Sequence, residues 1–451
     1  MNKLGRQTTN RCLAGLGIGT VRQWFQDNFL QRLFRNVGIL LSGDVAASLF
    51  GLIYLVLTTR ALGTSRFGIL VLVQTYVNVV DRLVSFQTWQ ALIKYGAEAV
   101  EEQVQDRFKG MVKMGTLLDV SSAILGTVIS ASAIFWIGPW LGWDSQTIHM
   151  AACYSVSILF HISSTPMAII RLYDKFRVFA VQRVICEGFK LLAVTVAYLT
   201  GAGLWAFVII WMATNVIRHL FLFAAGHYLL YRRHVLRWWK ARADGWRPFV
   251  AFNCWSSLAS SLDIPVKQLD VFIISSVLSL EAVGIYRVFK DIAQVITKVA
   301  DPIYQAIYPQ FAVMIAQAEA RRAAKMAVKL GVILILASTP VVFAISFFAP
   351  WWLGVFFGKV FAEQWLVLSA YMAYQTVSLA FQGLHPLFVA MGYIRKNFFI
   401  LALANGTFLL CAWRFGGTWG LIGIVLALAV QFSIVVFLKI FYLRRGLHGT
   451  L

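Results

Sequence analysis

The chain has 451 residues, of which 59% are hydrophobic and only 13% are charged. Too few polar side chains remain to cover a soluble globule of this size, so the composition indicates a multi-pass membrane protein. A net charge of +21 would favour nucleic-acid binding in a soluble chain. In a membrane protein it indicates a basic cytoplasmic rim, and we expect no nucleic-acid partner. Five scattered cysteines without a CxxC pair, and seven histidines without metal-ligand spacing, predict no metal site and no cofactor.

Residues 1–36 precede the first long apolar stretch and are predicted to form a cytoplasmic N-terminal segment. Apolar side chains recur within it at helical spacing, which is typical of an amphipathic helix at the membrane interface. A plain N-terminal tail fits the same residues equally well. The apolar positions are Val21, Trp24, Phe25, Phe29, Leu33, Phe34 and Val37.

Twelve apolar stretches follow, and each approaches or exceeds the ~20 residues that a helix needs to cross the hydrocarbon core. In chain order they cover residues 37–59, 67–91, 111–137, 147–170, 178–200, 203–230, 249–279, 283–309, 327–349, 364–391, 397–415 and 418–442. We therefore predict an all-α polytopic membrane protein with twelve transmembrane helices in two bundles of six. The bundles are expected at 37–230 and 249–442, with a basic cytoplasmic linker at 231–248 and a cytoplasmic tail at 443–451.

The distribution of Lys and Arg predicts the orientation of these spans. Loops on the same side as the two termini hold 29 basic residues, whereas loops on the opposite side hold four. Under the positive-inside rule this difference places both termini in the cytoplasm. The remaining seven basic residues lie within spans, where an ionised side chain costs at least ~2.5 kcal/mol unless it faces a partner or water.

The two halves share a short repeat at an offset of 216 residues. At this offset residues 60–70 (RALGTSRFGIL) align with residues 276–286 (SVLSLEAVGIY), and each segment connects the first two spans of its half. The identical pairs are Leu62 with Leu278, Gly68 with Gly284, and Ile69 with Ile285. We therefore predict that a pseudo-twofold axis along the membrane normal relates the bundles, with a cavity at the seam.

Several motifs lie around these two turns and in one later loop. They are Asn36 with Arg60-Ala-Leu-Gly63 and Gly68, Lys267-Gln-Leu-Asp270 with Leu278 and Val283-Gly-Ile-Tyr286, and Phe357-Gly-Lys-Val-Phe361 with Glu363. The pattern resembles the Wzx-type flippases, the polysaccharide transporter branch of the MATE-like MOP superfamily, over residues 34–442. The resemblance implies a MATE-like fold in the bacterial inner membrane. It also implies transport of polyprenyl-diphosphate-linked oligosaccharides to the periplasmic leaflet, for O-antigen, capsule or exopolysaccharide synthesis.

The same resemblance implies a transporter and not an enzyme. Its expected partners are the lipid-linked substrate and membrane lipids, together with a polysaccharide polymerase and a chain-length regulator. The chain has no Walker A pattern and no loop large enough for a nucleotide-binding domain, so ATP does not drive transport within it. We expect alternating access coupled to a gradient of H⁺ or Na⁺.

Cations inside the spans are the candidate substrate-binding residues, because Arg and Lys replace water around a diphosphate through charge-assisted hydrogen bonds. On the eighth span polar residues recur at steps of three and four from Arg287 to Lys298, so they form a stripe on one face of the helix. The candidates are Arg82, Arg218, Lys267, Arg287, Lys290 and Lys298. By the repeat, Arg82 is expected opposite Lys298.

Carboxylates inside the spans are the candidate ion-coupling residues, since a buried Asp can carry a proton. They are Asp44, Asp81, Asp119, Asp263, Asp270 and Asp291. Some of the charges could instead be structural pairs, because Arg287 with Asp291 and Asp263 with Lys267 are four residues apart. We expect Glu187 and Lys190 to reach the cytoplasmic headgroups.

Two other functions fit the composition. A MATE-like drug or cation antiporter would share the fold, but it would favour an acidic cavity. An integral-membrane glycosyltransferase or ligase would also be apolar and basic, but it would need a large loop with catalytic carboxylates, and no loop here is long enough.

Overall fold

A computed structural model describes most of the chain as helices joined by short turns. The described residues are 28–101, 105–242, 246–261, 264, 268–298, 307, 311, 314–315, 317 and 319–448. They contain no β-strand. The predicted amphipathic helix lies partly outside these residues, and the described part from Asn28 continues directly into the first span.

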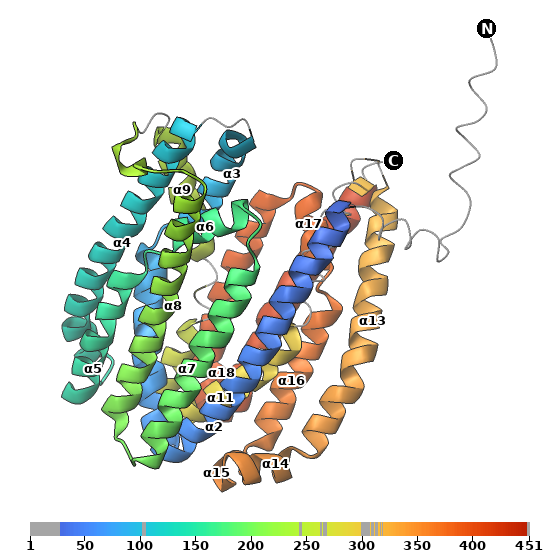
Figure 1. The fold of residues 1–451 in the computed structure, drawn as a ribbon. Coiled ribbons are helices and arrows are strands. Elements are labelled where there is room, and N and C mark those ends of the chain that lie inside the picture. Colours follow the sequence, from blue (N-terminus) through green and yellow to red (C-terminus); the bar gives the residue numbers. More distant parts are fainter. Residues whose placement is uncertain are drawn as a thin grey trace.

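The first half of the chain forms helices that run side by side (Figure 1). They are α2 (Asn28–Val84), α3 (Thr88–Glu101), α4 (Gln105–Trp140), α5 (Ser145–Ser155), η1 (Val156–Phe160), α6 (Ser164–Leu172), α7 (Arg177–Leu199) and α8 (Leu204–Arg232). Gly63 interrupts α2 with φ 69° and ψ 174°, a backbone conformation that glycine adopts without strain. The chain reverses there, so α2 contains the first two predicted spans (Figure 1).

The second half is also helical over its described residues. After the short η2 (Trp238–Lys240) come α9 (Trp246–Ser261), α10 (Asp270–Val277), α11 (Leu280–Lys298), α13 (Ala320–Phe347), α14 (Ala349–Phe356), α15 (Lys359–Glu363), α16 (Trp365–Ala380), α17 (Leu384–Ala390) and α18 (Ile394–His448). Gly420 interrupts α18 with φ 61°, so α18 contains the last two predicted spans. Every predicted span is mainly helical over its described residues, and short non-helical segments divide some spans into two helices.

The start of α2 and the end of α18 lie at one end of the bundle, which we call the terminal end (top of Figure 1). The opposite end, with Gly63 and α15, is called the distal end. Six helical segments of the described chain are long and apolar enough to cross a membrane, and the two longest are the reversed α2 and α18 segments. The chain is therefore a multi-pass membrane protein.

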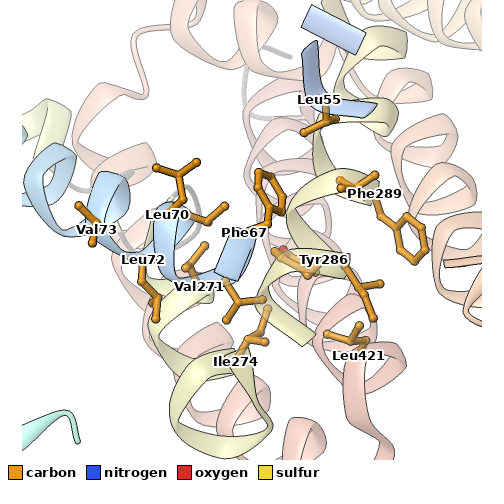
Figure 2. Close-up of a cluster of buried hydrophobic side chains, with 14 of the residues drawn as sticks. Leu55, Phe67, Leu70, Leu72, Val73, Val271, Ile274, Tyr286, Phe289 and Leu421 are labelled. Atoms are coloured by element: carbon orange, nitrogen blue, oxygen red, sulfur yellow. The ribbon is translucent and has the colours of Figure 1, made fainter. Parts of the chain in front are cut away.

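Apolar side chains of α2, α10, α11 and α18 pack together toward the distal end (Figure 2). Phe67, Ile274 and Tyr286 are buried in this cluster. Lipid competes with protein for apolar surface, so tight packing rather than the exclusion of water holds such helices together. The cluster joins the two halves of the molecule at the distal end.

Candidate functional site

A cavity of about 1160 Å³ lies at the seam between the halves, enclosed by α2, α3, α6, α7, α8 and α11. Its lining reaches Leu40 and Phe176 at the terminal end. In the other direction it stops near Phe67 and Arg287, about 10 Å along α11 from its distal start. The cavity therefore extends from the terminal end into the middle of the bundle, where the internal repeat predicts it.

Polar contacts close the distal end of the bundle, beyond the end of the cavity. Arg60 of α2 donates hydrogen bonds to the carbonyl oxygens of Val355 and Phe356 at the end of α14, the latter at 2.9 Å. The hydroxyl of Thr64 lies 3.3 Å from a carboxylate oxygen of Glu281 on α11. Each contact connects the N-terminal half to the C-terminal half, so opening of the distal end must break them.

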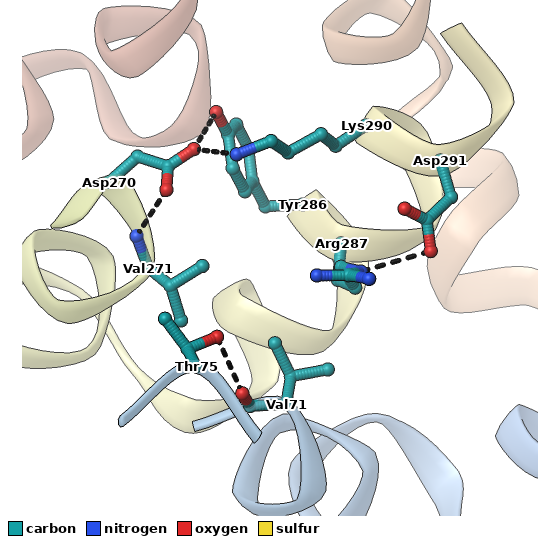
Figure 3. A network of polar contacts seen from close by, with 8 residues as sticks. All are labelled: Val71, Thr75, Asp270, Val271, Tyr286, Arg287, Lys290 and Asp291. Carbon is teal, nitrogen blue, oxygen red and sulfur yellow. Dashed lines mark hydrogen bonds and ion pairs between the residues drawn. The ribbon is translucent and has the colours of Figure 1, made fainter. Parts of the chain in front are cut away.

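Five basic and three acidic side chains line the cavity among the described residues. All three acids are paired with a neighbouring base. Asp44 of α2 pairs with Arg183 of α7. Oε1 of Glu187 on α7 lies 2.6 Å from a guanidinium nitrogen of Arg218 on α8. Asp291 lies 2.9 Å from Arg287 on the same helix (Figure 3). Two cations, Arg171 and Lys190, remain without a carboxylate in this set.

Lys190 is held by aromatic rings. Its Nζ lies 3.7 Å from the ring centre of Trp211 and 4.1 Å from that of Tyr54, and the residue is only 7% exposed. The expectation that Lys190 reaches the headgroups was wrong, because the residue lies near the middle of the 23-residue α7 and points into the bundle. Cation–π contacts stabilise such an ammonium by about 0.5–2 kcal/mol without neutralising its charge.

Arg171 is held in the same way nearer the terminal end. Its guanidinium carbon lies 4.3 Å from the ring centre of Trp89 and 5.7 Å from that of Phe179. The two cations that carry the net charge of the cavity wall are thus both packed on rings. Their N–H groups remain available to an anionic ligand, because an aromatic face satisfies charge but accepts hydrogen bonds poorly.

The predicted cations are placed differently from one another. Arg218 and Arg287 line the cavity, whereas Arg82 at the end of α2 does not. Lys290 is buried behind the cavity wall, where it pairs with Asp270, and the Tyr286 hydroxyl donates to the same carboxylate at 2.7 Å (Figure 3). Lys267 lies outside the described residues, as does the side chain of Lys298, so the expected opposition of Arg82 and Lys298 stays a prediction.

The predicted carboxylates are likewise distributed among several environments. Asp44 and Asp291 line the cavity, Asp270 is buried beside Lys290, and Asp263 lies outside the described residues. Asp119 of α4 accepts hydrogen bonds from the Thr88 hydroxyl at 2.5 Å and the Thr165 backbone N–H at 2.7 Å. It therefore ties together the first turns of α3 and α6. Asp81 lies 2.9 Å from His161.

Sequence reasoning missed three aromatic or imidazole partners of these charges. Tyr54 and Trp211 come from different helices than Lys190, and no spacing within one helix reveals such a cage. The position of Lys190 near the centre of its predicted span was the available signal. His161 has no metal-ligand spacing along the chain, and its partners Asp81 and His219 lie on other helices.

Comparisons with known proteins give a family and a fold. A profile of the polysaccharide biosynthesis protein family matches residues 33–315. The inner membrane protein YghQ of Escherichia coli (strain K12) is 32% identical over 171 residues, which are 38% of this chain and 47% of YghQ. The aligned segment thus spans about half the length of that relative.

Among solved structures, a multidrug resistance MATE family transporter of the MOP superfamily, inward-facing, has a TM-score of 0.73 at 13% identity, over 89% of this chain and 95% of that one. Lipid II flippase MurJ, inward closed, has a TM-score of 0.66 at 14% identity, over 90% and 87%. A MOP superfamily transporter from Pyrococcus furiosus Vc1 (DSM3638) has a TM-score of 0.64 at 13% identity, over 93% of this chain and 96% of that one. These similarities confirm the predicted MATE-like fold with its two related bundles.

Proposed function

Because this chain belongs to the polysaccharide biosynthesis protein family, we propose that it is a flippase for polyprenyl-diphosphate-linked oligosaccharides in the bacterial inner membrane. It would move them from the cytoplasmic to the periplasmic leaflet during surface polysaccharide assembly. The observation that carries this proposal is the net positive cavity, whose two unneutralised cations, Arg171 and Lys190, are packed on aromatic rings.

The chemistry of such a substrate fits the cavity lining. A diphosphate cannot cross hydrocarbon without replacement of its water shell, and Lys190 with the neighbouring Arg218 offers donors for its oxygens. Tyr54, Trp89 and Trp211 line the same cavity, and the ring faces that the two cations do not cover would stack on sugar rings. The polyprenyl tail would remain in lipid, so only the headgroup needs the aqueous path.

Alternating access is the transport mechanism that we propose, and the closed distal end supports it. With the termini in the cytoplasm, as the distribution of basic residues predicts, this structure opens its cavity to the cytoplasm. A headgroup bound near Lys190 would be released once the contacts of Arg60 and Thr64 across the distal seam break. An H⁺ or Na⁺ gradient would supply the energy, and a polymerase and a chain-length regulator would act on the delivered product.

The charge of the cavity also bears on the MATE-like antiporter alternative. An exporter of organic cations would gain from unpaired carboxylates, but each carboxylate that lines this cavity in the described chain has a basic partner. Lys190 would repel a cationic drug from the centre of the cavity. The lining therefore favours an anionic substrate.

Substitution of Lys190 tests the proposal. Cells that lack the native protein would express Lys190→Gln, Lys190→Arg or a control, Lys325→Gln, which lies exposed on α13. Loss of charge-assisted hydrogen bonds of about 1.5–3 kcal/mol predicts a 10- to 100-fold fall in surface polysaccharide for Lys190→Gln. Lys190→Arg should retain more activity, and Lys325→Gln should match the wild type. Full assembly by Lys190→Gln at equal membrane abundance would disprove the assignment.

A further inference from the structure

Two predicted spans of the N-terminal half are interrupted, and the two interruptions lie close together in space. One break separates α2 from α3 at residues 85–87, and the other separates η1 from α6 at residues 161–163. Broken helices expose backbone groups inside a membrane, and transporters tolerate them chiefly where they line a cavity or an ion site. Three titratable side chains meet at these breaks, namely Asp81, His161 and His219.

The three side chains form one connected group. A carboxylate oxygen of Asp81 lies 2.9 Å from His161 Nδ1, and its other oxygen accepts from the Ser85 hydroxyl at 2.8 Å. The imidazole of His219 stacks on that of His161 with 3.9 Å between ring centres. Nδ1 of His219 is 2.7 Å from the hydroxyl of Ser163.

The group lies directly behind the wall of the cavity. His219 and Ser163 are cavity-lining residues, whereas the side chain of His161 is only 8% exposed and that of Asp81 21%. A proton can therefore reach His219 from the cavity, whereas His161 is shielded and Asp81 is partly exposed but does not line the cavity. The group is therefore neither fully exposed to solvent nor fully sealed from the cavity.

The hydrogen bonds of His161 suit a group that gains and loses one proton. Its Nδ1 faces the Asp81 carboxylate, and its Nε2 lies 3.1 Å from the side-chain amide of Asn215. Neutral His161 donates from Nδ1 and accepts at Nε2 from the amide NH₂. A second proton on Nε2 is accommodated if the Asn215 amide turns its oxygen inward. The Asp81 carboxylate on one side and the stacked imidazole of His219 on the other are the charged and titratable neighbours of this ring.

Most charged side chains around this group are engaged in other contacts, so this group is the one whose protonation we expect to change. On α8, Arg218 next to His219 is paired with Glu187 of α7. On α4, Asp119 is engaged by Thr88 and Thr165. Arg82 follows Asp81 on α2 and has no ion-pair partner among the described residues. A proton fits this group better than Na⁺, because imidazole nitrogens occupy positions where Na⁺ would need oxygen ligands.

We propose that Asp81, His161 and His219 form the binding site of the coupling proton. The proposal rests on the proposed function only in assuming an ion-driven transporter, and it does not depend on the identity of the substrate. Proton binding at the broken helices would change the balance between the distal-closed arrangement and one that is open at the distal end.

The test measures that balance without substrate. Spin labels would be placed at Ser65→Cys and Lys359→Cys, two exposed distal positions in different halves, after replacement of the five native cysteines. Distances between the labels would be measured by pulsed electron resonance in lipid nanodiscs between pH 5.5 and 8.5, in potassium and in sodium buffer. The variants are His161→Gln, His219→Gln and Asp81→Asn, each checked for helicity and melting. The control is His149→Gln, an exposed histidine of α5.

We expect the ratio of the two distance populations in the unsubstituted protein to change by up to about tenfold per pH unit, as one bound proton requires. The change should persist in His149→Gln and Lys190→Gln and be lost in folded His161→Gln and Asp81→Asn. A change that survives in both of these variants overturns the proposal. So does a ratio that responds to sodium and not to pH. Failure of Lys190→Gln in polysaccharide assembly, with its pH response intact, would separate this site from the substrate site.

Discussion

Gly68 of α2 and Gly284 of α11 face one another at the distal seam. A methyl group at position 68 would overlap the carbonyl oxygen of Leu280, and one at position 284 would overlap that of Thr64. Positions 64 and 280 are related by the same 216-residue offset as positions 68 and 284. The contact is thus reciprocal, as a pseudo-twofold axis requires, and both glycines permit the close approach of the two backbones.

Replacement of either glycine by alanine should open the distal seam. We expect Gly68→Ala and Gly284→Ala to weaken the distal-closed state by similar amounts, because the overlap in each case involves backbone atoms that cannot move aside. Labelling of Ser65→Cys and Lys359→Cys would show the shift as an increase of at least about fivefold in the open population, which corresponds to about 1 kcal/mol. Gly406→Ala on α18, where no atom lies nearby, is the control. Equal populations in all four proteins would show that the contact does not hold the seam.

Asp119 is predicted to matter for stability more than for transport. Removal of its carboxylate in Asp119→Ala leaves the Thr165 N–H and the Thr88 hydroxyl buried without their acceptor, at a cost of about 1–3 kcal/mol each. We expect a lower melting temperature and less protein in the membrane. Asp119→Asn retains one acceptor oxygen and should be intermediate. Normal melting of Asp119→Ala combined with lost transport would instead support the ion-coupling role considered from the sequence.

The fold could be predicted from the sequence because the lengths of the apolar stretches and the repeat around Gly68 and Gly284 are local or periodic signals. The contacts of the site could not. Lys190 depends on rings from α2 and α8, and His161 depends on Asp81 and His219 from two other helices. Such pairs arise only when separate helices are packed, so no spacing along one helix reveals them.

The breaks within spans were also invisible to an apolar window. Residues 161–163 lie inside the predicted span 147–170, and the polar run that begins at His161 is too short to divide this span in a window of ~20 residues. The break persists because Asp119 binds the Thr165 N–H at the start of α6, a contact 46 residues apart in the chain. Hydropathy therefore locates spans well and their interruptions poorly.

In the buried pair of Asp270 and Lys290, substitution of one partner should lower the melting temperature more than substitution of both. Lys290→Met leaves the carboxylate of Asp270, which is fully buried, without its ammonium partner. Breaking such a pair typically costs about 3–5 kcal/mol, whereas replacing both partners is often near neutral. We expect Lys290→Met to melt well below the wild type and Asp270→Asn with Lys290→Met to recover most of the loss. A double variant no more stable than Lys290→Met would contradict a dominant ion-pair role.

The aromatic cage of Lys190 provides the sharpest test of how the cavity presents its charge. Trp211→Leu keeps an apolar side chain but removes the nearer of the two rings, which lies 3.7 Å from the ammonium, so Lys190 should lose its fixed position. Tyr54→Phe keeps the other ring at 4.1 Å and removes only a hydroxyl. With a cation–π contribution of about 1–2 kcal/mol, we expect surface polysaccharide assembly to fall about 5- to 30-fold in Trp211→Leu and little in Tyr54→Phe. Trp211→Phe should restore part of the loss because a phenyl ring still presents a π face. If Trp211→Leu instead matched the wild type at equal membrane abundance, the ring of Trp211 would contribute only to helix packing. Lys190 would then support transport without the cation–π contact.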